Sequence, residues 1–423
     1  MWFKFTLNDR DGSDHKMLYN SYTSELRGDH IIPSDNKKPL EDWTIPLKVQ
    51  KSNPENHLGK VKTPKTMKIQ MGLACNYSCN YCNQAFEIAK ATVSKLSDVE
   101  KFLTQLDTWL EEAPEVIELW GGEPFVYWAK MKRLIPALHE KFPNSQFLVI
   151  TNGSMFDQER IEFIRKYDIS IGISHDGPGQ EENRGPDPFK DPEKRRWIEA
   201  LVAERKDKVS FNTVLTKNNY DLTAIQDWFF EELGDDVNIT LEGVVNTYDV
   251  PTLLGSGRFQ EKELEGLSNG VFLAIANNPL AFSLNSRIDE FYNSIEKGRP
   301  IQSLGQKCGM DRVDDIAVDL QGNVMTCQNT GAKGVHKIGH VTDFDNIKLN
   351  TSTHLTFRDS CMNCPVVQLC KGSCMFLHDE FFEQSCKNEL SFNTGILRGA
   401  MFHLTGKMLT NIEKIGLELP ETV

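Results

Sequence analysis

The chain has 423 residues, of which 39% are hydrophobic and 25% are charged, as in a globular protein with a large core. Its net charge of −13 argues against a general affinity for nucleic acid. The sequence has neither a run of 18 apolar residues nor a signal-peptide pattern, so we expect no membrane segment and a cytoplasmic location. Because disulfides do not persist in a reducing cytosol, we expect the ten cysteines to bind metal.

Residues 1–66 are polar and rich in proline, and Phe3, Phe5 and Leu7 alternate as in a short strand. The stretch has too few periodic apolar residues for an independent domain. We predict an irregular N-terminal arm that either wraps the next domain or serves as a lid or docking segment.

Apolar stretches typical of strands alternate with helical patterns from residue 67 to residue 245. The predicted strands are 67–73, 115–120, 146–150, 169–173, 209–215 and 237–245. Alternating strands and helices indicate a parallel sheet, so the predicted fold class is α/β. In barrels built this way, the functional side chains lie at the carboxyl ends of the strands.

Three cysteines follow the first predicted strand with the spacing C-x3-C-x2-C, at Cys75, Cys79 and Cys82. Three thiolates this close in sequence can hold three irons of a four-iron cluster and leave the fourth iron open. A structural zinc site usually has four ligands in paired units, so we favour the iron cluster.

With Tyr81 directly before the third cysteine, the motif resembles that of the radical S-adenosylmethionine (SAM) enzymes. The resemblance implies a partial (β/α)6 barrel over residues 67–245 and a cluster whose open iron is chelated by SAM. It also implies reductive cleavage of SAM to a 5′-deoxyadenosyl radical, which takes a hydrogen atom from the substrate. Tyr81 is counted among the cofactor-binding residues.

The same resemblance assigns SAM-binding residues to the ends of the later strands. The segment Gly121-Gly122-Glu123-Pro124 resembles the family's GGEP motif, which receives the SAM amino group. Asn152 ends the third strand, and Ser174 opens a segment similar to the family's S-x-D-G, which faces the ribose. Arg184 is expected near the SAM carboxylate, and the strand that ends at Leu215 is expected to present its backbone to the adenine.

Two residues inside the S-x-D-G segment have less specific expectations. For His175, packing on the outer face is favoured over a role beside the substrate. Asp176 is expected to shape the turn.

Seven cysteines near the C-terminus resemble the SPASM module of radical SAM enzymes in every spacing. In relatives this module binds two auxiliary four-iron clusters. The resemblance assigns the outer cluster to Cys361, Cys364, Cys370 and Cys386, and the inner cluster to Cys308, Cys327 and Cys374. For the fourth position of the inner cluster, an aspartate such as Asp314 and an open site are both considered, and a zinc module is the alternative for the whole array.

These features divide the chain into five predicted parts. They are an irregular arm (1–66), the radical SAM partial barrel (67–245), a helical bridge (246–306), a cysteine-rich SPASM iron–sulfur domain (307–390) and a C-terminal helix (391–423). The predicted C-terminal helix rests on a stripe with helical spacing, which we expect to pack, formed by Ile396, Met401, Leu404, Met408 and Ile412.

We therefore expect an oxidoreductase with SAM and three [4Fe-4S] clusters that oxidises or cross-links a ribosomally made peptide or protein. The auxiliary clusters would take the electron, and a flavodoxin- or ferredoxin-type protein would donate electrons to the enzyme. Gln328 stands where sulfatase-maturating relatives have an aspartate, which disfavours that activity. A radical SAM enzyme acting on a small molecule and a non-catalytic iron–sulfur electron carrier remain as alternatives.

Overall fold

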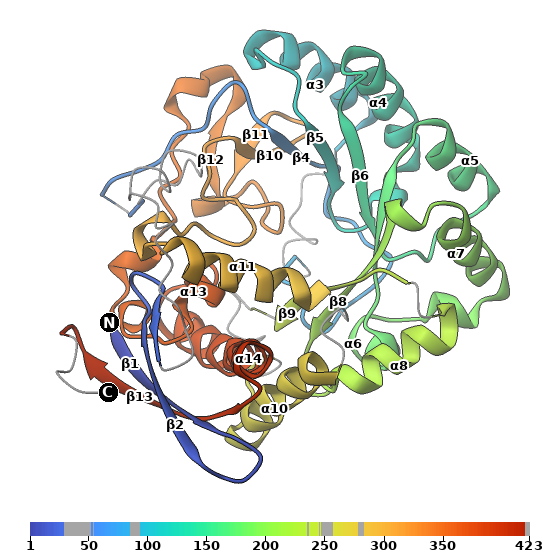
Figure 1. The fold of residues 1–423 in the computed structure, drawn as a ribbon. Helices are drawn as coiled ribbons and strands as arrows, with labels where there is room; N and C mark the ends of the chain where they lie inside the picture. Colours follow the sequence, from blue (N-terminus) through green and yellow to red (C-terminus); the bar gives the residue numbers. More distant parts are fainter. Residues whose placement is uncertain are drawn as a thin grey trace.

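A computed structural model of the chain describes residues 1–28, 52–84 except 54, 94–234, 237–244, 246, 257–277 and 283–418. Figure 1 shows a sheet curved into an arc, with helices on its outer side and a second group of helices near its open side. Both termini lie near that second group of helices.

The arc belongs to a nine-stranded sheet with the order β12-β11-β10-β4-β5-β6-β7-β8-β9. Six neighbouring strands are parallel, namely β4 (Thr66–Gln70), β5 (Val116–Trp120), β6 (Gln146–Thr151), β7 (Ser170–Ser174), β8 (Val209–Leu215) and β9 (Ile239–Val244). Each overlaps one of the six predicted strands, so the predicted parallel α/β sheet is confirmed.

Amphipathic helices cover the outer face of the arc (Figure 1). They are α3 (Leu96–Trp109), α4 (Trp128–Lys141), α5 (Gln158–Lys166), α7 (Pro192–Glu204) and α8 (Leu222–Leu233), with the short α6 (Gln180–Asn183) between α5 and α7. Because side chains alternate along a strand, β5 buries Ile117 and Leu119 in the apolar core, while Glu118 points to the opposite, inner face. There Glu118 forms an ion pair of 3.2 Å with Lys68 of β4.

The cysteine-rich region continues the barrel sheet. Its strand β10 (Asp315–Asp319) pairs in parallel with β4, and the antiparallel strands β11 (Asn323–Met325) and β12 (Lys337–His340) follow. Two short helices, α12 (Asp359–Met362) and α13 (Val367–Cys370), carry further cysteines. The predicted bridge contains the helices α10 (Glu261–Asn277) and α11 (Leu284–Lys297), whereas the domain boundaries stay predictions.

The prediction of an irregular arm is wrong for residues 1–27. This segment forms β1 (Trp2–Asn8), β2 (Asp14–Asn20) and β3 (Glu25–Arg27), and the remainder of the arm lies largely outside the described residues. The three strands belong to a four-stranded sheet with the order β13-β1-β2-β3. The alternation of Phe3, Phe5 and Leu7 thus indicated one strand correctly, but its partner β13 lies at the other end of the chain.

The predicted C-terminal helix also extends too far. Helix α14 (Asp379–Thr405) ends at Gly406, whose φ of +71° is in the left-handed region that favours glycine. Met408 and Ile412 lie in β13 (Met408–Gly416), where Ile412 pairs with Phe5 of β1. Ile396 and Met401 of the stripe are buried as expected, whereas Leu404 and Met408 are exposed, so the expected packing is wrong for these two residues.

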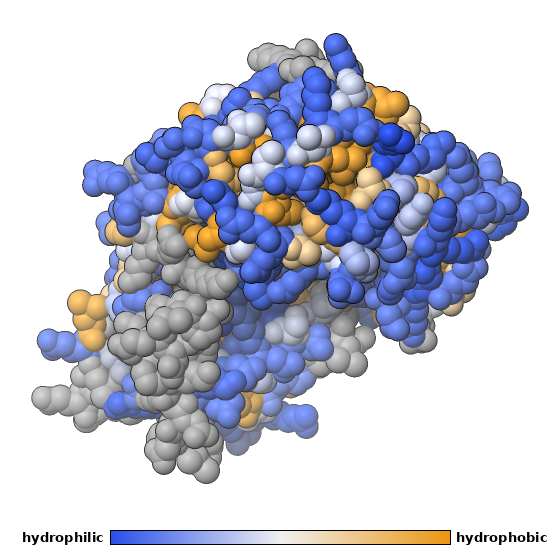
Figure 2. Space-filling model, turned by 90° about the horizontal axis from the view of Figure 1, so that it is seen from above, coloured by the Kyte–Doolittle hydropathy of each residue, from blue (hydrophilic) through white to orange (hydrophobic). Residues whose placement is uncertain are grey.

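The surface is polar on the face that Figure 2 shows. The face in Figure 2 is largely hydrophilic, with smaller hydrophobic areas between the polar residues. Within the described residues, no helix combines the length and the apolar character that crossing a membrane requires.

Candidate active site

The thiols form three sets whose members interact electrostatically. We name them the triad set (Cys75, Cys79, Cys82), the inner set (Cys308, Cys327, Cys374) and the outer set (Cys361, Cys364, Cys370, Cys386). The grouping follows the ligand sets that the sequence implied, while the role of each cysteine as an iron ligand stays a prediction.

The sulfur environments favour neutral thiols unless positive charge is supplied. Burial raises the pKa of Cys79 to about 12 and that of Cys327 to about 12. Among the described residues, no three Cys, His, Asp or Glu side chains lie close enough together to hold a single metal ion. A four-iron cluster instead binds each sulfur at a separate iron and supplies the charge that stabilises thiolates, so the donor sets fit it.

The triad loop is held by main-chain hydrogen bonds and by the segment after β7. The N–H of Tyr77 donates to the Cys75 Sγ at 3.3 Å, and its hydroxyl donates to the Pro186 carbonyl at 2.5 Å. The N–H of Asn80 donates to the Asn183 carbonyl at 2.8 Å. The loop therefore has fixed supports outside its own cysteines.

The end of β5 lies directly against the start of the triad loop. The N–H groups of Gly122 and Glu123 donate to the carbonyls of Gly72 and Ala74, each at 3.0 Å. A Cβ atom on Gly121 would lie 2.4 Å from the Gly72 oxygen, and one on Gly122 would lie 2.4 Å from the Ala74 oxygen. Only glycine permits this close approach of the two backbones, which explains why the predicted GGEP segment has glycine at both positions.

Glu123 joins β5 to β6. Its buried carboxylate accepts hydrogen bonds from the Phe125 N–H (3.0 Å), the Thr151 hydroxyl (2.7 Å) and the Asn152 N–H (2.7 Å). Burial raises the pKa of Glu123, although the three donors oppose that shift. The side chain thus fixes two strand ends, and Pro124 begins the short 3-10 helix that follows it.

Asn152 connects the same strand end to the triad loop. Its side-chain amide donates to the Asn76 side-chain oxygen at 2.9 Å. Asn76 in turn donates to the Ser154 hydroxyl at 2.7 Å, and Ser154 donates back to Asn152 at 2.6 Å. The sequence indicated Asn152 but not Asn76 or Ser154, since only their closed hydrogen-bond ring identifies them.

Asp176 is the centre of a buried polar network that sequence reasoning missed. Its Oδ2 accepts from the Tyr81 hydroxyl at 2.7 Å, and its Oδ1 accepts from the Val214 N–H at 3.1 Å. Oδ1 also lies 3.0 Å from Nε of Arg184, whose guanidinium is 5.5 Å from the centre of the Tyr81 ring. Burial lowers the pKa of Arg184, but Asp176 outweighs this and raises it above its ordinary value. Arg184 thus has a resident counter-ion.

The remaining predicted SAM-binding residues also occupy strand ends. Ser174 is half-buried at the end of β7 and pairs in register with Asn212 of β8. Leu215 is fully buried at the end of β8. His175 is buried and stacked on Trp228 at 4.6 Å, as the packing interpretation expects.

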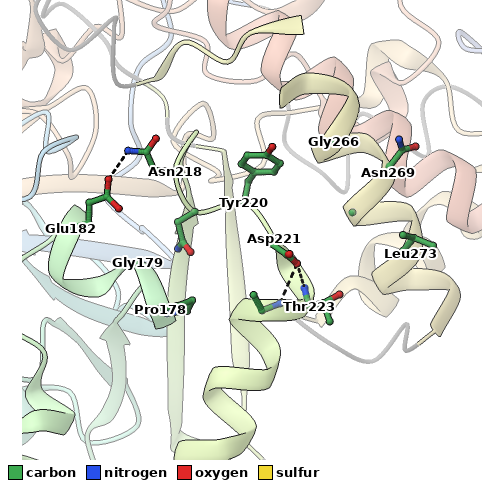
Figure 3. Close-up of a pocket in the computed structure, with 13 residues that line it drawn as sticks. Pro178, Gly179, Glu182, Asn218, Tyr220, Asp221, Thr223, Gly266, Asn269 and Leu273 are labelled. Atoms are coloured by element: carbon green, nitrogen blue, oxygen red, sulfur yellow. Dashed lines mark hydrogen bonds between the residues drawn. The ribbon is translucent and has the colours of Figure 1, made fainter. Parts of the chain in front are cut away.

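A groove of about 690 Å³ lies beside this network, between the connections after β7 and β8 and helix α10 (Figure 3). Its acidic side chains already have partners. Glu182 accepts from Asn218 at 2.6 Å, and Asp221 accepts from the Thr223 N–H at 3.0 Å as the cap of α8. These carboxylates therefore fix loops at the strand ends.

The segment after Cys327 contacts both flanks of the triad loop. The side-chain amide of Gln70 donates to the Thr330 carbonyl at 2.8 Å, and that of Gln84 donates to the Gln328 carbonyl at 3.2 Å. Residues before and after the triad set are therefore bonded to the segment that carries one inner cysteine.

Two aspartates near the inner set differ in the partners of their carboxylate oxygens. The Asp314 carboxylate oxygens lie 3.0 and 3.1 Å from guanidinium nitrogens of Arg312. Asp311 is buried, its Oδ2 accepts from the Gln306 N–H at 2.6 Å, and its Oδ1 has no hydrogen-bond partner among the described residues. Asp311 also interacts electrostatically with Cys308, so it fits a further ligand better than the predicted Asp314 does.

Comparisons with known proteins match the part of the chain that carries the triad set. A family model described as "Radical SAM superfamily" matches residues 69–227. The radical SAM cyclopropyl synthase TigE of Paramaledivibacter caminithermalis is 21% identical over 348 residues, which cover 74% of this chain and 68% of that protein. A serine-type anaerobic sulfatase-maturating enzyme of Bacteroides thetaiotaomicron is 24% identical over 178 residues, or 38% of this chain and 42% of that protein.

A solved structure has the same fold. The structure of anSMEcpe with bound AdoMet and Cp18Cys peptide matches with a TM-score of 0.54 at 19% identity, covering 77% of this chain and 96% of that one. The parallel strands, the cysteine motif at their carboxyl edge and the family match agree. Residues 69–227 therefore form a radical SAM domain, and the cysteine-rich C-terminal region fits the SPASM type.

Proposed function

We propose that the chain is a radical SAM oxidoreductase that modifies a peptide or protein and uses two auxiliary clusters as electron acceptors. One observation carries this proposal: Gln70 and Gln84, on the two sides of the triad set, are both bonded to the segment that begins at Cys327. The centre that generates a radical and a centre that accepts an electron would then lie on either side of this segment.

The residues at the strand ends would hold the first cluster and SAM. The triad set would ligate three irons, and the backbone around Gly122 would receive the SAM amino group. When bound, the cluster and SAM supply reductive cleavage to a 5′-deoxyadenosyl radical. Glu123 and Asn152 would fix the strand ends, and the Asp176 network would keep the wall beside Tyr81 rigid, so that one substrate C–H bond is held near the radical.

The inner and outer sets would hold the auxiliary clusters. Four cysteines complete the outer set, whereas the inner set has three. The unpartnered oxygen of Asp311 supports this residue as the fourth inner ligand. Protein-modifying relatives support a peptide substrate, because the anSMEcpe structure contains a bound peptide and a sulfatase-maturating enzyme acts in protein maturation. A flavodoxin- or ferredoxin-type donor and a cytoplasmic location complete the proposal.

Iron and sulfide analysis after anaerobic reconstitution tests the cluster count. We expect about twelve irons per chain, which is three four-iron clusters. Replacing all three triad cysteines by alanine is expected to remove about four irons, as is replacing the outer cysteines. Zinc in place of iron, or an iron content that does not follow the three sets, contradicts the proposal.

The substrate class is tested by incubating the loaded enzyme and SAM with candidate short peptides encoded beside its gene. A mass change of the peptide that requires the triad set supports the peptide assignment. Modification of a small molecule only, with every such peptide unchanged, overturns it.

A further inference from the structure

Arg358 is a buried cation whose hydrogen bonds go to main-chain carbonyls. Its Nη1 donates to the carbonyls of Gly372 and Cys374, both at 3.1 Å. Its Nη2 donates to the carbonyls of Met375 at 2.9 Å and Leu377 at 2.8 Å. One guanidinium therefore organises the whole turn around Cys374 of the inner set.

The same side chain reaches the elements that carry the outer set. The Arg358 guanidinium lies 4.2 Å from the centre of the Phe382 ring, on α14 one turn before Cys386. Arg358 is also the residue before α12, and its carbonyl accepts from the Cys361 N–H at 3.0 Å. Arg358 thus stands between the inner and outer sets.

No carboxylate lies within ion-pair distance of Arg358 in the described part of the chain. The neighbours whose thiolate charge would offset the burial of its guanidinium are Cys361, Cys374, Cys386 and Cys370. Carbonyl dipoles solvate the cation but do not neutralise it, and a buried charge without a counter-ion is costly. The thiolates of the two sets are the available counter-charge.

Arg299 offers a contrast in the same region. It is also buried and donates to the Gln368 side chain at 3.0 Å and the Gln368 carbonyl at 2.9 Å. Unlike Arg358, it has a carboxylate partner, since its Nη1 lies 2.7 Å from Glu290. Arg299 is therefore a buried arginine with a complete ion pair, and it serves as the matched control.

We propose that Arg358 is a positioning residue that supplies a fixed positive charge between the two auxiliary clusters and raises their reduction potentials. This inference rests on the proposed function, because it requires both clusters. In the step concerned, the substrate radical loses one electron and is oxidised, and an auxiliary cluster gains that electron and is reduced. The reduced cluster carries one more negative charge, so a nearby fixed cation stabilises it relative to the oxidised cluster.

The test measures auxiliary-cluster potentials in the full chain, reconstituted anaerobically, with the triad cysteines replaced by alanine so that only auxiliary clusters give signals. Reductive titration followed by electron paramagnetic resonance is compared for this background and for Arg358→Gln, Arg358→Lys and Arg299→Gln. We expect Arg358→Gln to lower the reduction potential by at least about 59 mV, which is a tenfold change in the equilibrium constant for a one-electron reduction. Arg358→Lys and Arg299→Gln are expected to change this equilibrium constant less than about threefold.

The outcomes separate the two proposals. If the background protein contains no auxiliary clusters, the proposed function fails before Arg358 is tested. If the clusters are present and Arg358→Gln leaves their potentials unchanged, or Arg299→Gln shifts them equally, the role of Arg358 is refuted. If Arg358→Gln does not retain iron, the iron content of Arg358→Lys decides the outcome. Full iron content in Arg358→Lys supports the need for a cation at this position, whereas loss of iron in both variants refutes the role of Arg358.

Discussion

Replacement of Asp176 by alanine should severely destabilise the buried network that joins Tyr81, Arg184 and Val214. The change leaves the buried guanidinium of Arg184 without its counter-ion and removes the acceptor of the Tyr81 hydroxyl and the Val214 N–H. Breaking a buried ion pair from one side costs about 3–5 kcal/mol. Unpaired buried donors cost about 1–3 kcal/mol each, and the two effects overlap, so we expect a total of at least about 3 kcal/mol.

Hydrogen exchange provides a local measurement of this loss, because the Val214 N–H itself donates to Asp176. A loss of 3 kcal/mol corresponds to an exchange rate raised more than about a hundredfold in a peptide from β8. Glu204→Ala is the matched control, since Glu204 pairs with Arg165 at 2.8 Å on the surface and should contribute only about 0–1 kcal/mol.

Two results separate a role for the ion pair from a loss of packing. Asp176→Asn keeps the size of the side chain and one acceptor, so its exchange rate should lie between those of the wild type and Asp176→Ala. If Asp176→Ala raises exchange in β8 no more than Glu204→Ala does, the network does not stabilise β8, and the reasoning is refuted.

Three further predictions test other parts of the account. Gly122→Ala should reduce the affinity for SAM at least about tenfold in an equilibrium binding measurement, because the new Cβ would lie 2.4 Å from carbonyl oxygens. Gly270→Ala is the control: Gly270 has open space around it, so the affinity should stay unchanged. Burial lowers the pKa of His175, so the unfolded chain takes up a proton that the folded chain does not, and the free energy of unfolding should fall as the pH drops below about 6.5. In urea-unfolding measurements over a series of pH values, His175→Gln should make this fall less steep. An unchanged pH dependence contradicts the prediction. Cys374→Ala should lower the iron content by about four atoms while the signals of the outer cluster persist; loss of the outer signals would contradict the grouping.

The sequence allowed prediction of elements whose information is local. Each of the six barrel strands has a continuous apolar or alternating pattern, and β8 was predicted with its observed bounds. The cysteine sets were also recognisable, because their spacing resembles a known module. Predictions of this kind need only neighbouring residues or a familiar motif.

The remaining features depend on contacts between distant segments. β1 has its strand partner β13 some 400 residues away, where a helical stripe concealed a strand. Asp176 was expected to shape a turn, although its partners come from three separate segments. Arg358 attracted no attention in the sequence, since the carbonyls that it binds carry no residue-specific signal.

Formation of 5′-deoxyadenosine from SAM tests the central claim most directly. The reconstituted chain is incubated anaerobically with dithionite and SAM, and the product is followed by liquid chromatography beside a variant in which Cys75, Cys79 and Cys82 are alanine. The account predicts 5′-deoxyadenosine from the wild type and none from the variant, with auxiliary clusters still present in both. Intact SAM with a fully iron-loaded wild type, or equal product from the variant, would contradict it.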